Sequence, residues 1–420
     1  MMRQISWRTS IGLVFRCDLR PLRNEGVRVA SENEGRKTNL LYSPPSMPRS
    51  QGYIPTLDGW RALSIAAVML FHLPTLTFGG WPLRAVQSRG ALGVQVFFVI
   101  SGLLICTRLL REEERFGKIS LSGFYKRRLL RIQPAAILYL LTLLVLAAIH
   151  WIPLGMSAWW SALFAWRSYY PKHLWEIPGV TYTNHFWSLA VEKHFYLIIP
   201  AVLVFIPRRR RWWALVGIYL LSFVWARMAT HWHLTDNRTD VSFELLMLPS
   251  LLAIAFYQKK ELRAAINGPR VFALVLLICA MLMVSFRWLH GTATGLMFQT
   301  LFVCCVFGTS MAPSSQASRI LELAPFRFIG RISYSLYLWQ QLFCINPVGD
   351  RTSAVMARLQ APPVNIFAAF CCALLSYYLV ERPFIRLAHV PSAAPRKIDH
   401  GVAGAKVGKA GASEVEDAPL

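Results

Sequence analysis

Ten long apolar stretches run through the chain, and most of them are long enough to cross a lipid bilayer as helices. A backbone that crosses a bilayer must satisfy its hydrogen bonds internally, which restricts such stretches to helices here. Only 16% of the residues are charged, against about 25% in a typical soluble domain. We therefore predict an all-α, polytopic membrane helix bundle of about ten transmembrane helices. The stretches are 57–76, 91–109, 133–152, 185–206, 212–230, 242–257, 271–289, 293–311, 330–347 and 363–385.

Basic residues are distributed unevenly between the two sides of the predicted bundle. A net charge of +24 in a soluble domain would suggest nucleic-acid binding. Here 33 of the 45 Lys and Arg residues lie in segments on the side of the N-terminus, and eight lie on the opposite side. Because basic residues collect on the cytoplasmic side, both termini are predicted to be cytoplasmic. The lipid bilayer is the expected partner of this charge pattern, and nucleic acid is not.

The two ends of the chain differ from its apolar body. Residues 1–50 are polar, basic and aperiodic, without the apolar core of a signal peptide. Two interpretations are open: a disordered cytoplasmic tail, or a start codon assigned too early, with translation beginning at Met47. We expect a membrane domain over 51–388 and a disordered cytoplasmic tail over 389–420. Seven of the eight cysteines lie in apolar stretches and none forms a C-x-x-C pair, so neither a disulfide framework nor a metal site is expected.

The first apolar stretch contains three ionisable residues in DGWRALSIAAVMLFH, from Asp58 to His72. Ionisable groups at membrane depth are costly, and each is a candidate functional residue. Arg61 and His72 are eleven residues apart, about three helical turns, so they lie on nearly the same face about 16 Å apart along the axis. Asp58 lies about 21 Å from His72 along the axis, too far to orient its ring, and is expected to pair with Arg61.

Arginines cluster in FYKRRLLRIQP, in the segment that precedes the third stretch. Arg127 and Arg131 are four residues apart and share a helical face, and Arg128 and Arg131 are three apart. Guanidinium groups bind phosphate oxygens in a bidentate manner. Such a cluster most often anchors a cytoplasmic loop, but together with Arg61 it can form an anion pocket for a phosphorylated donor.

Other polar residues interrupt later stretches. HFWSLAVEKHFYLIIP contains Glu192, with Tyr196 four residues further on the same face; a carboxylate here must pair, hydrogen-bond or face water. Glu192 is a candidate to orient His72, to line an acceptor path or to form a structural ion pair. Ser101 is a candidate cavity residue, whereas Gly102 is expected to permit close helix contact. Tyr334 and Tyr337 lie on one side of the helix predicted for RISYSLYLWQQ.

Three further features have a structural interpretation that we prefer. Glu381 in VERPF is expected to form an ion pair with Arg382 at a helix end, and His185 is expected at the membrane interface. The segment 153–184 is rich in Trp and Tyr, which is typical of an interfacial aromatic belt. A lid or a sugar-stacking surface is the alternative for that segment.

Six stretches, taken together and in order, resemble the integral-membrane acyltransferase-3 family of bacterial surface-glycan O-acyltransferases. They cover about residues 53–386 and include an arginine and a histidine with the family's spacing of ten intervening residues. The stretches are LDGWRALSIAAVMLFH, GVQVFFVISGLLI, FYKRRLLRIQP, HFWSLAVEKHFYLIIP, ISYSLYLWQQ and VERPF.

The resemblance implies a ten-helix enzyme of the bacterial cytoplasmic (inner) membrane. Its acyl group would come from cytoplasmic acyl-CoA, with acetyl-CoA as the expected donor substrate and no permanently bound cofactor or metal. The acceptor would be a hydroxyl of an extracytoplasmic or lipid-linked glycan, such as a polysaccharide or lipopolysaccharide. The resemblance makes Arg61 and His72 the essential pair and Arg127, Arg128 and Arg131 donor-binding residues, and Ser101 and Glu192 match family motif positions. We therefore predict catalytic residues His72, Arg61 and Glu192; donor-binding residues Arg61, Arg127, Arg128 and Arg131; and substrate-lining residues Ser101, Tyr196, Tyr334 and Tyr337.

The sequence departs from the family pattern at two places. The family often has Glu-Glu-Gln where this chain has Glu192-Lys193-His194, and often a histidine where this chain has Gln340. Either departure indicates that the acceptor binds in a shifted position or that the residue at that place in the sequence is not catalytic. The acyl group and the acceptor stay open at this point.

The expected mechanism separates binding from chemistry. CoA phosphates would bind Arg61 and the arginine cluster, and the thioester would lie near His72, which acts as a general base or carries the acyl group. The group that orients His72 must come from another helix, with Glu192 as a candidate. Two rival interpretations use the same charges: a glycan transporter or flippase, and a non-catalytic membrane scaffold.

Overall fold

A computed structural model describes residues 53–73, 77–78, 81–82, 89–170, 178–232, 234, 237–258, 273, 277, 292–311, 315–345 and 352–388. The predicted tails, 1–50 and 389–420, and the question of Met47 lie outside these residues. Apart from two short strands, the described elements are helical, which confirms the all-α class. The strands, β1 (Thr77–Phe78) and β2 (Trp81–Pro82), form one antiparallel pair.

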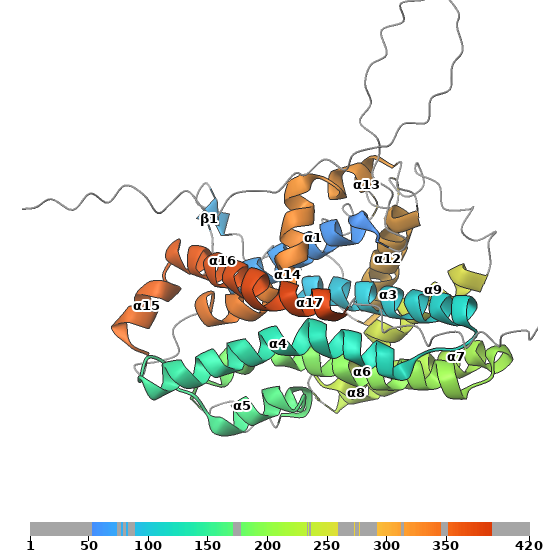
Figure 1. Cartoon of the computed structure of the whole chain (residues 1–420), viewed down its shortest axis with the longest axis horizontal. Helices are drawn as coiled ribbons and strands as arrows, with labels where there is room; N and C mark the ends of the chain where they lie inside the picture. The colour runs from blue at the N-terminus through green and yellow to red at the C-terminus, as the bar shows by residue number, and fades with distance from the viewer. Residues whose placement is uncertain are drawn as a thin grey trace, which may run out of the picture. The chain divides into compact units, whose positions relative to one another are not determined.

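Helices cover nine of the ten predicted stretches (Figure 1). The seventh, 271–289, falls almost entirely outside the described residues. The main helices are α1 (Pro55–His72), α3 (Leu92–Phe116), α4 (Leu121–Ala148), α6 (Phe186–Phe205), α7 (Arg208–His231), α9 (Glu244–Gln258), α12 (Thr292–Met311), α14 (Ala324–Phe343) and α16 (Val364–Ser376).

Shorter elements complete the chain between and after these helices. They are η1 (Arg89–Ala91), α5 (Met156–Leu163), η2 (Arg167–Tyr169), η4 (Val180–Thr183), α8 (Thr239–Ser242), α13 (Gln316–Leu321), α15 (Ala354–Gln360), the π-helical turn η5 (Tyr377–Glu381) and α17 (Arg382–Ala388). The helix formed by α16, η5 and α17 is continuous, and its α17 end packs against α4 (Figure 1).

Five helices among the described residues are long and apolar enough to cross a membrane, which supports a multi-pass membrane protein. They span Leu92–Phe116, Leu121–Ala148, Val180–Phe205, Arg208–Ala229 and Val364–Ala388. The count of ten and the cytoplasmic termini stay predictions.

Two helices extend beyond the predicted stretches. α3 continues past residue 109 to Phe116 and ends at Gly117, whose φ of 71° few other residues adopt readily. α4 begins at Leu121 because the Ser120 hydroxyl accepts a hydrogen bond from the Gly123 amide, which caps the helix. The arginine cluster placed before the third stretch is therefore part of the helix itself.

Close helix contacts at glycines fix the position of α1. Gly330 of α14 lies against the backbone of Asp58, and Gly59 lies against Leu321, so neither position has space for a Cβ atom. Gly102 of α3 lies against the Leu246 carbonyl of α9, which confirms its predicted role in close helix contact. These small residues let the helix backbones approach closely, which holds α1 and its Arg61 side chain in place.

The buried apolar residues form two large clusters. One is built mainly by α3, α6, α9 and α12, and the other mainly by α1, α4, α14 and α16. Val94 and Tyr334 pack against both clusters. Polar side chains collect where the clusters meet, and this boundary holds the site described next.

Aromatic residues of the 153–184 segment divide into buried and exposed groups. Trp159 is buried, and its indole N–H donates to the Leu140 carbonyl, so it holds α5 to α4. Trp160 and Trp166 are exposed. The exposed pair is compatible with both predicted interpretations, a belt and a stacking surface.

Candidate active site

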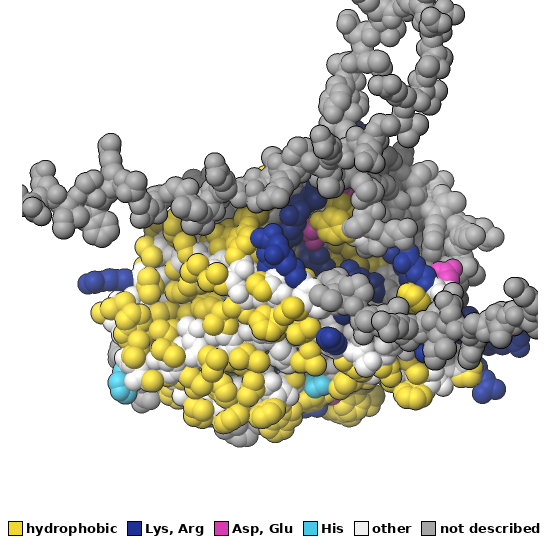
Figure 2. All heavy atoms as spheres, viewed as in Figure 1, with side chains coloured by type: hydrophobic (Ala, Val, Ile, Leu, Met, Phe, Trp, Pro, Cys, Tyr) yellow, Lys and Arg dark blue, Asp and Glu magenta, His cyan; other side chains and the backbone are white. Residues whose placement is uncertain are grey.

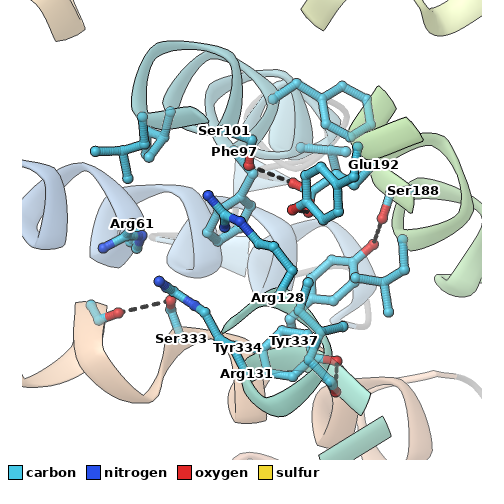
Figure 3. A pocket seen from close by; sticks show the side chains of 18 of the residues that line it. Arg61, Phe97, Ser101, Arg128, Arg131, Ser188, Glu192, Ser333, Tyr334 and Tyr337 are labelled. Carbon is cyan, nitrogen blue, oxygen red and sulfur yellow. Dashed lines mark hydrogen bonds between the residues drawn. The ribbon is translucent and has the colours of Figure 1, made fainter. Parts of the chain in front are cut away.

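A cavity opens between α1, α3, α4, α6, α14 and η5; we call it the central cavity (Figure 3). Its empty volume is about 840 Å³, part of which is open to solvent. The polar lining consists of Arg61, Ser101, Arg128, Arg131, Ser188, Glu192, Tyr196, Arg331, Ser333, Tyr334, Tyr337 and Glu381.

Four arginines line the central cavity, from three helices. Arg61 comes from α1, Arg128 and Arg131 from α4, and Arg331 from α14. Figure 3 shows Arg61, Arg128 and Arg131 directed into the same space, and Figure 2 shows Lys and Arg side chains gathered in one part of a face that is otherwise mostly hydrophobic. With two carboxylates in the same lining, the cations are in excess. Such an arrangement suits a polyanion.

Arg61 is held in place by Asp58. Its guanidinium nitrogen lies 2.8 Å from the Asp58 carboxylate, and the Arg61 side chain is 16% exposed. The predicted pair three residues apart is therefore confirmed. Since Asp58 is buried against α14, this pair fixes the direction of Arg61 toward the cavity.

The predicted arginine cluster is divided by the helix. Arg128 and Arg131 line the cavity, and the Arg128 guanidinium lies 5.1 Å from the centre of the Tyr196 ring. Arg127 is outside the lining and forms an ion pair with Glu112 at 2.9 Å. A step of about 100° per residue separates neighbours on a helix, which directs Arg127 away from Arg128.

Glu192 connects two helices at the cavity wall. It accepts hydrogen bonds from the Ser101 hydroxyl of α3 and the Tyr196 hydroxyl of α6, both at 2.7 Å (Figure 3). Ser101, Tyr196, Tyr334 and Tyr337 all line the cavity, where the sequence analysis expected substrate. Their contact with substrate stays a prediction.

The two predicted tyrosines of α14 bind neighbouring backbone. The Tyr334 hydroxyl donates to the Ile132 carbonyl at 2.8 Å. The Tyr337 hydroxyl lies 2.6 Å from the Ser188 hydroxyl and donates to the His185 carbonyl at 3.0 Å. These bonds tie α14 to α4 and to the start of α6, so they fix the walls of the cavity.

His72 lies at the last position of α1 and is not part of the central cavity lining. Its Nδ1 is 2.9 Å from the Val68 carbonyl oxygen. A carbonyl only accepts, so Nδ1 carries the hydrogen and Nε2 of the neutral ring keeps a free electron pair. The prediction that a group from another helix orients His72 is wrong. The Val68 carbonyl of α1 itself orients the ring, and both oxygens of the candidate Glu192 are bonded elsewhere, to Ser101 and Tyr196.

The structure adds residues that the sequence analysis missed. Glu381 is 2% exposed, lines the cavity and accepts a hydrogen bond from the Ser335 hydroxyl at 2.7 Å. The preferred helix-end ion pair with Arg382 is therefore wrong; the Arg382 guanidinium packs over the Tyr378 ring. π-helical turns such as η5 are frequent at functional sites. Further polar lining residues that were not predicted are Arg331, Ser188 and Ser333.

His185 is also placed differently from the prediction. Its side chain is 3% exposed and is surrounded by the rings of Tyr139, Phe186 and Tyr337, so it is not an interface residue. Within the described part of the chain, neither of its ring nitrogens has a hydrogen-bond partner. A buried imidazole in this state is rare in folded proteins and calls for an explanation.

Comparison with known proteins identifies a domain over nearly the same residues as the six sequence motifs. Residues 54–382 match the acyltransferase domain family. The chain is 29% identical over 379 residues to the O-acetyltransferase OatA of Staphylococcus aureus (strain NCTC 8325 / PS 47), a match that covers 83% of this chain and 58% of the relative. It is 28% identical over 365 residues to the peptidoglycan O-acetyltransferase OatA of Listeria monocytogenes, covering 80% and 56%. No solved structure matches the chain.

Proposed function

Because the chain belongs to the acyltransferase domain family, we propose that it is a membrane O-acyltransferase that uses acyl-CoA. The acyl group, with acetyl as the first choice, passes from the cytoplasmic side to a glycan hydroxyl on the opposite side. The chain spans less than three fifths of the length of the two relatives described above, so their names guide this proposal without fixing it.

One observation carries the proposal: four arginines from three helices line one cavity. Coenzyme A carries several phosphate oxygens, which arginine side chains bind with paired, charge-assisted hydrogen bonds. Asp58 positions Arg61 without neutralising the whole cluster, because Arg128, Arg131 and Arg331 form no ion pair among the described residues. The cavity therefore keeps a positive excess for the donor.

His72 is the proposed catalytic group. In one route its Nε2 removes the proton of the acceptor hydroxyl, whose oxygen attacks the thioester carbon; the C–S bond breaks and the CoA thiolate takes up a proton. In the other route Nε2 attacks the thioester carbon, the C–S bond breaks and CoA leaves as the thiolate, so that the imidazole carries the acyl group. The acceptor oxygen then attacks the acyl carbon, the C–N bond breaks to restore the neutral imidazole, and the hydroxyl proton is taken up by the CoA thiolate. Both routes need the electron pair that the Nδ1 contact with Val68 leaves on Nε2.

The distance between Arg61 and His72 is part of the proposal. Eleven residues of α1 correspond to about 16 Å along the helix axis. The phosphates and the reacting carbonyl are thus held at different depths. This separation supports a donor that enters from one side and an acceptor that is modified nearer the other.

For the acceptor we favour a glycan hydroxyl. The printed name of the Listeria relative includes peptidoglycan, and a peptidoglycan or a related lipid-linked glycan is our first choice for this chain. Lipopolysaccharide and other surface polysaccharides are further members of the same acceptor class. The bacterial cytoplasmic membrane is the compartment in which this donor and this acceptor meet.

The direct test uses the purified full chain in proteoliposomes, with acetyl-CoA labelled in its acetyl group and a peptidoglycan fragment as acceptor. We expect labelled ester on the glycan and free CoA in equal amounts. Transport of the unmodified fragment without any release of CoA would instead support the flippase interpretation. Absence of both activities, in protein that still binds acetyl-CoA, would support a scaffold.

A further inference from the structure

A second pocket lies beside the central cavity, between α4 and α6; we call it the lateral pocket. Its polar residues are Tyr125, Arg128, Gln133, Lys193 and Tyr196, and Leu129, Ile132 and Leu197 complete its lining. Its empty volume is about 520 Å³. Arg128, Ile132 and Tyr196 also line the central cavity, so these side chains form the wall between the two.

The sequence builds this pocket from two helical stripes. On both helices the lining residues recur at intervals of three or four. On α4 they are Tyr125, Arg128, Leu129, Ile132 and Gln133, and on α6 they are Lys193, Tyr196 and Leu197. Residues at these intervals share one helical face. The Tyr125 hydroxyl donates to the Tyr196 carbonyl at 3.3 Å, which holds the two stripes against each other.

Two cations in the lateral pocket have no anionic partner among the described residues. Neither Lys193 nor Arg128 takes part in an ion pair there. The Arg128 guanidinium packs over the rings of Tyr196 and Phe124, at 5.1 and 5.8 Å from their centres. The Glu192 carboxylate of the central cavity attracts it without forming an ion pair. Cations within membrane-crossing helices are costly unless something pairs with them. Two like charges in one pocket increase the need for an anion.

The surroundings indicate how an anion reaches the pocket. Leu129 and Leu197 both line it and are 55% and 59% exposed. They belong to helices that are apolar enough to cross the membrane, so their exposed sides face lipid. A freely dissolved anion would have to cross that apolar surface, whereas the headgroup of a membrane lipid can enter from the side.

We propose that the lateral pocket binds the phosphate group of an anionic phospholipid, with Lys193 and Arg128 as its cationic contacts and the acyl chains along Leu129 and Leu197. The lipid comes from the leaflet on the side where α4 begins, since Tyr125 and Arg128 lie in its first two turns. Arg128 then connects the lipid site with the central cavity. This proposal does not depend on acyl transfer.

The experiment measures lipid retention by native mass spectrometry of the purified full chain, titrated in detergent with phosphatidylglycerol or with a neutral glycolipid that has no phosphate. No acyl donor is present, so the result is independent of enzyme activity. We expect the chain to retain phosphatidylglycerol selectively. Lys193→Gln should weaken this retention about fivefold, the usual effect of one basic residue near anionic lipid.

Two further variants control for a general effect of charge and for a folding defect. Lys126→Gln removes the same charge from an exposed position of α4 outside the pocket and should leave retention unchanged. Lys193→Arg keeps a cation in place and should restore retention, which a folding defect at this position would not allow. Equal retention by the wild type and Lys193→Gln, or equal retention of both lipids, overturns the proposal. Displacement of phosphatidylglycerol by inorganic phosphate would also overturn it, because free phosphate would then be the ligand.

Discussion

The two ends of α1 carry different chemistry. At the Asp58 end, four arginines line the central cavity, and Asp58 holds one of them, Arg61, at 2.8 Å. At the His72 end, the polar groups are imidazoles in an aromatic environment, and both ring nitrogens of His185 lack partners among the described residues. The first end is suited to hold a charged ligand, and the second to exchange protons or form new hydrogen bonds.

The difference follows from the cost of charge at membrane depth. Arginine keeps its charge under all ordinary conditions, so it needs nearby polar groups or an anionic ligand. A neutral imidazole tolerates burial and still offers a nitrogen lone pair. An enzyme with this division would bind the donor at one level and carry out chemistry at another, and mutations at the two ends should therefore have separable effects.

The largest effect is expected at the His72 end. His72→Ala should lower acyl transfer by about 10²–10⁴-fold, the range for loss of a general acid–base group, while the dissociation constant for acetyl-CoA stays near that of the wild type. Both are measured on the same proteoliposomes. His231→Ala, a change at an exposed histidine at the end of α7, is the control and should transfer normally. Normal transfer by His72→Ala would remove the catalytic role.

At the other end, Arg61→Ala should weaken acetyl-CoA binding by about tenfold or more, because a charge-assisted hydrogen bond contributes about 1.5–3 kcal/mol. Titration calorimetry measures the change. Arg127→Ala is the matched control, since Arg127 lies outside the cavity lining and pairs with Glu112. Equal loss in both variants would show that the division of the arginine cluster does not govern binding.

The contact that fixes the Asp58 end is tested by Gly330→Ala. A Cβ atom at this position meets the Asp58 backbone, so the variant should lose about 1–3 kcal/mol of stability, as is usual for overpacking, and its thermal midpoint should fall. Gly217→Ala on α7 is matched in chemistry, but there is nothing within 4 Å of its added Cβ. That control should be neutral or slightly stabilising; an unchanged midpoint for Gly330→Ala would argue against the close α1–α14 contact.

A smaller effect is expected for Ser101→Ala, which removes the hydrogen bond to Glu192. A hydrogen bond to a charged group contributes about 1.5–3 kcal/mol. Because the Tyr196 hydroxyl still donates to Glu192 in the variant, we expect the lower end of this range at most, a fall of about tenfold or less in the rate or the donor affinity. Ser310→Ala removes a hydroxyl that donates to its own helix at Val306, away from the cavity, and serves as the comparison. If both variants have the same rate and donor affinity, the hydrogen bond between Ser101 and Glu192 does not contribute to function.

Local features of the site were predictable from the sequence. Helical periodicity is a property of short segments, so it located the apolar helices and the Asp58–Arg61 pair. It also identified Gly102 as a helix contact, because a small residue within a long apolar run has few other uses.

Features that depend on packing between distant segments were not predictable. Glu381 reaches the cavity through the contacts of α17 and η5 with α4, and nothing in VERPF distinguishes a surface pair from a buried acid. The same holds for His185, whose burial depends on Tyr139 and Tyr337 from two other helices. The helical step separates Arg127 from Arg128, but which of the two faces the cavity depends on the rotation of α4 in the bundle, and no spacing within the segment reveals it.

In the mechanism that we propose, the donor binds at the Asp58 end of α1, and this end faces the cytoplasm. Membrane vesicles of opposite orientation, with labelled acetyl-CoA supplied only to the outside, test it directly. Inside-out vesicles present the Asp58 end to the donor, so we expect labelled glycan inside them and none in right-side-out vesicles. Equal labelling in sealed vesicles of both orientations, or labelling in right-side-out vesicles alone, would contradict it.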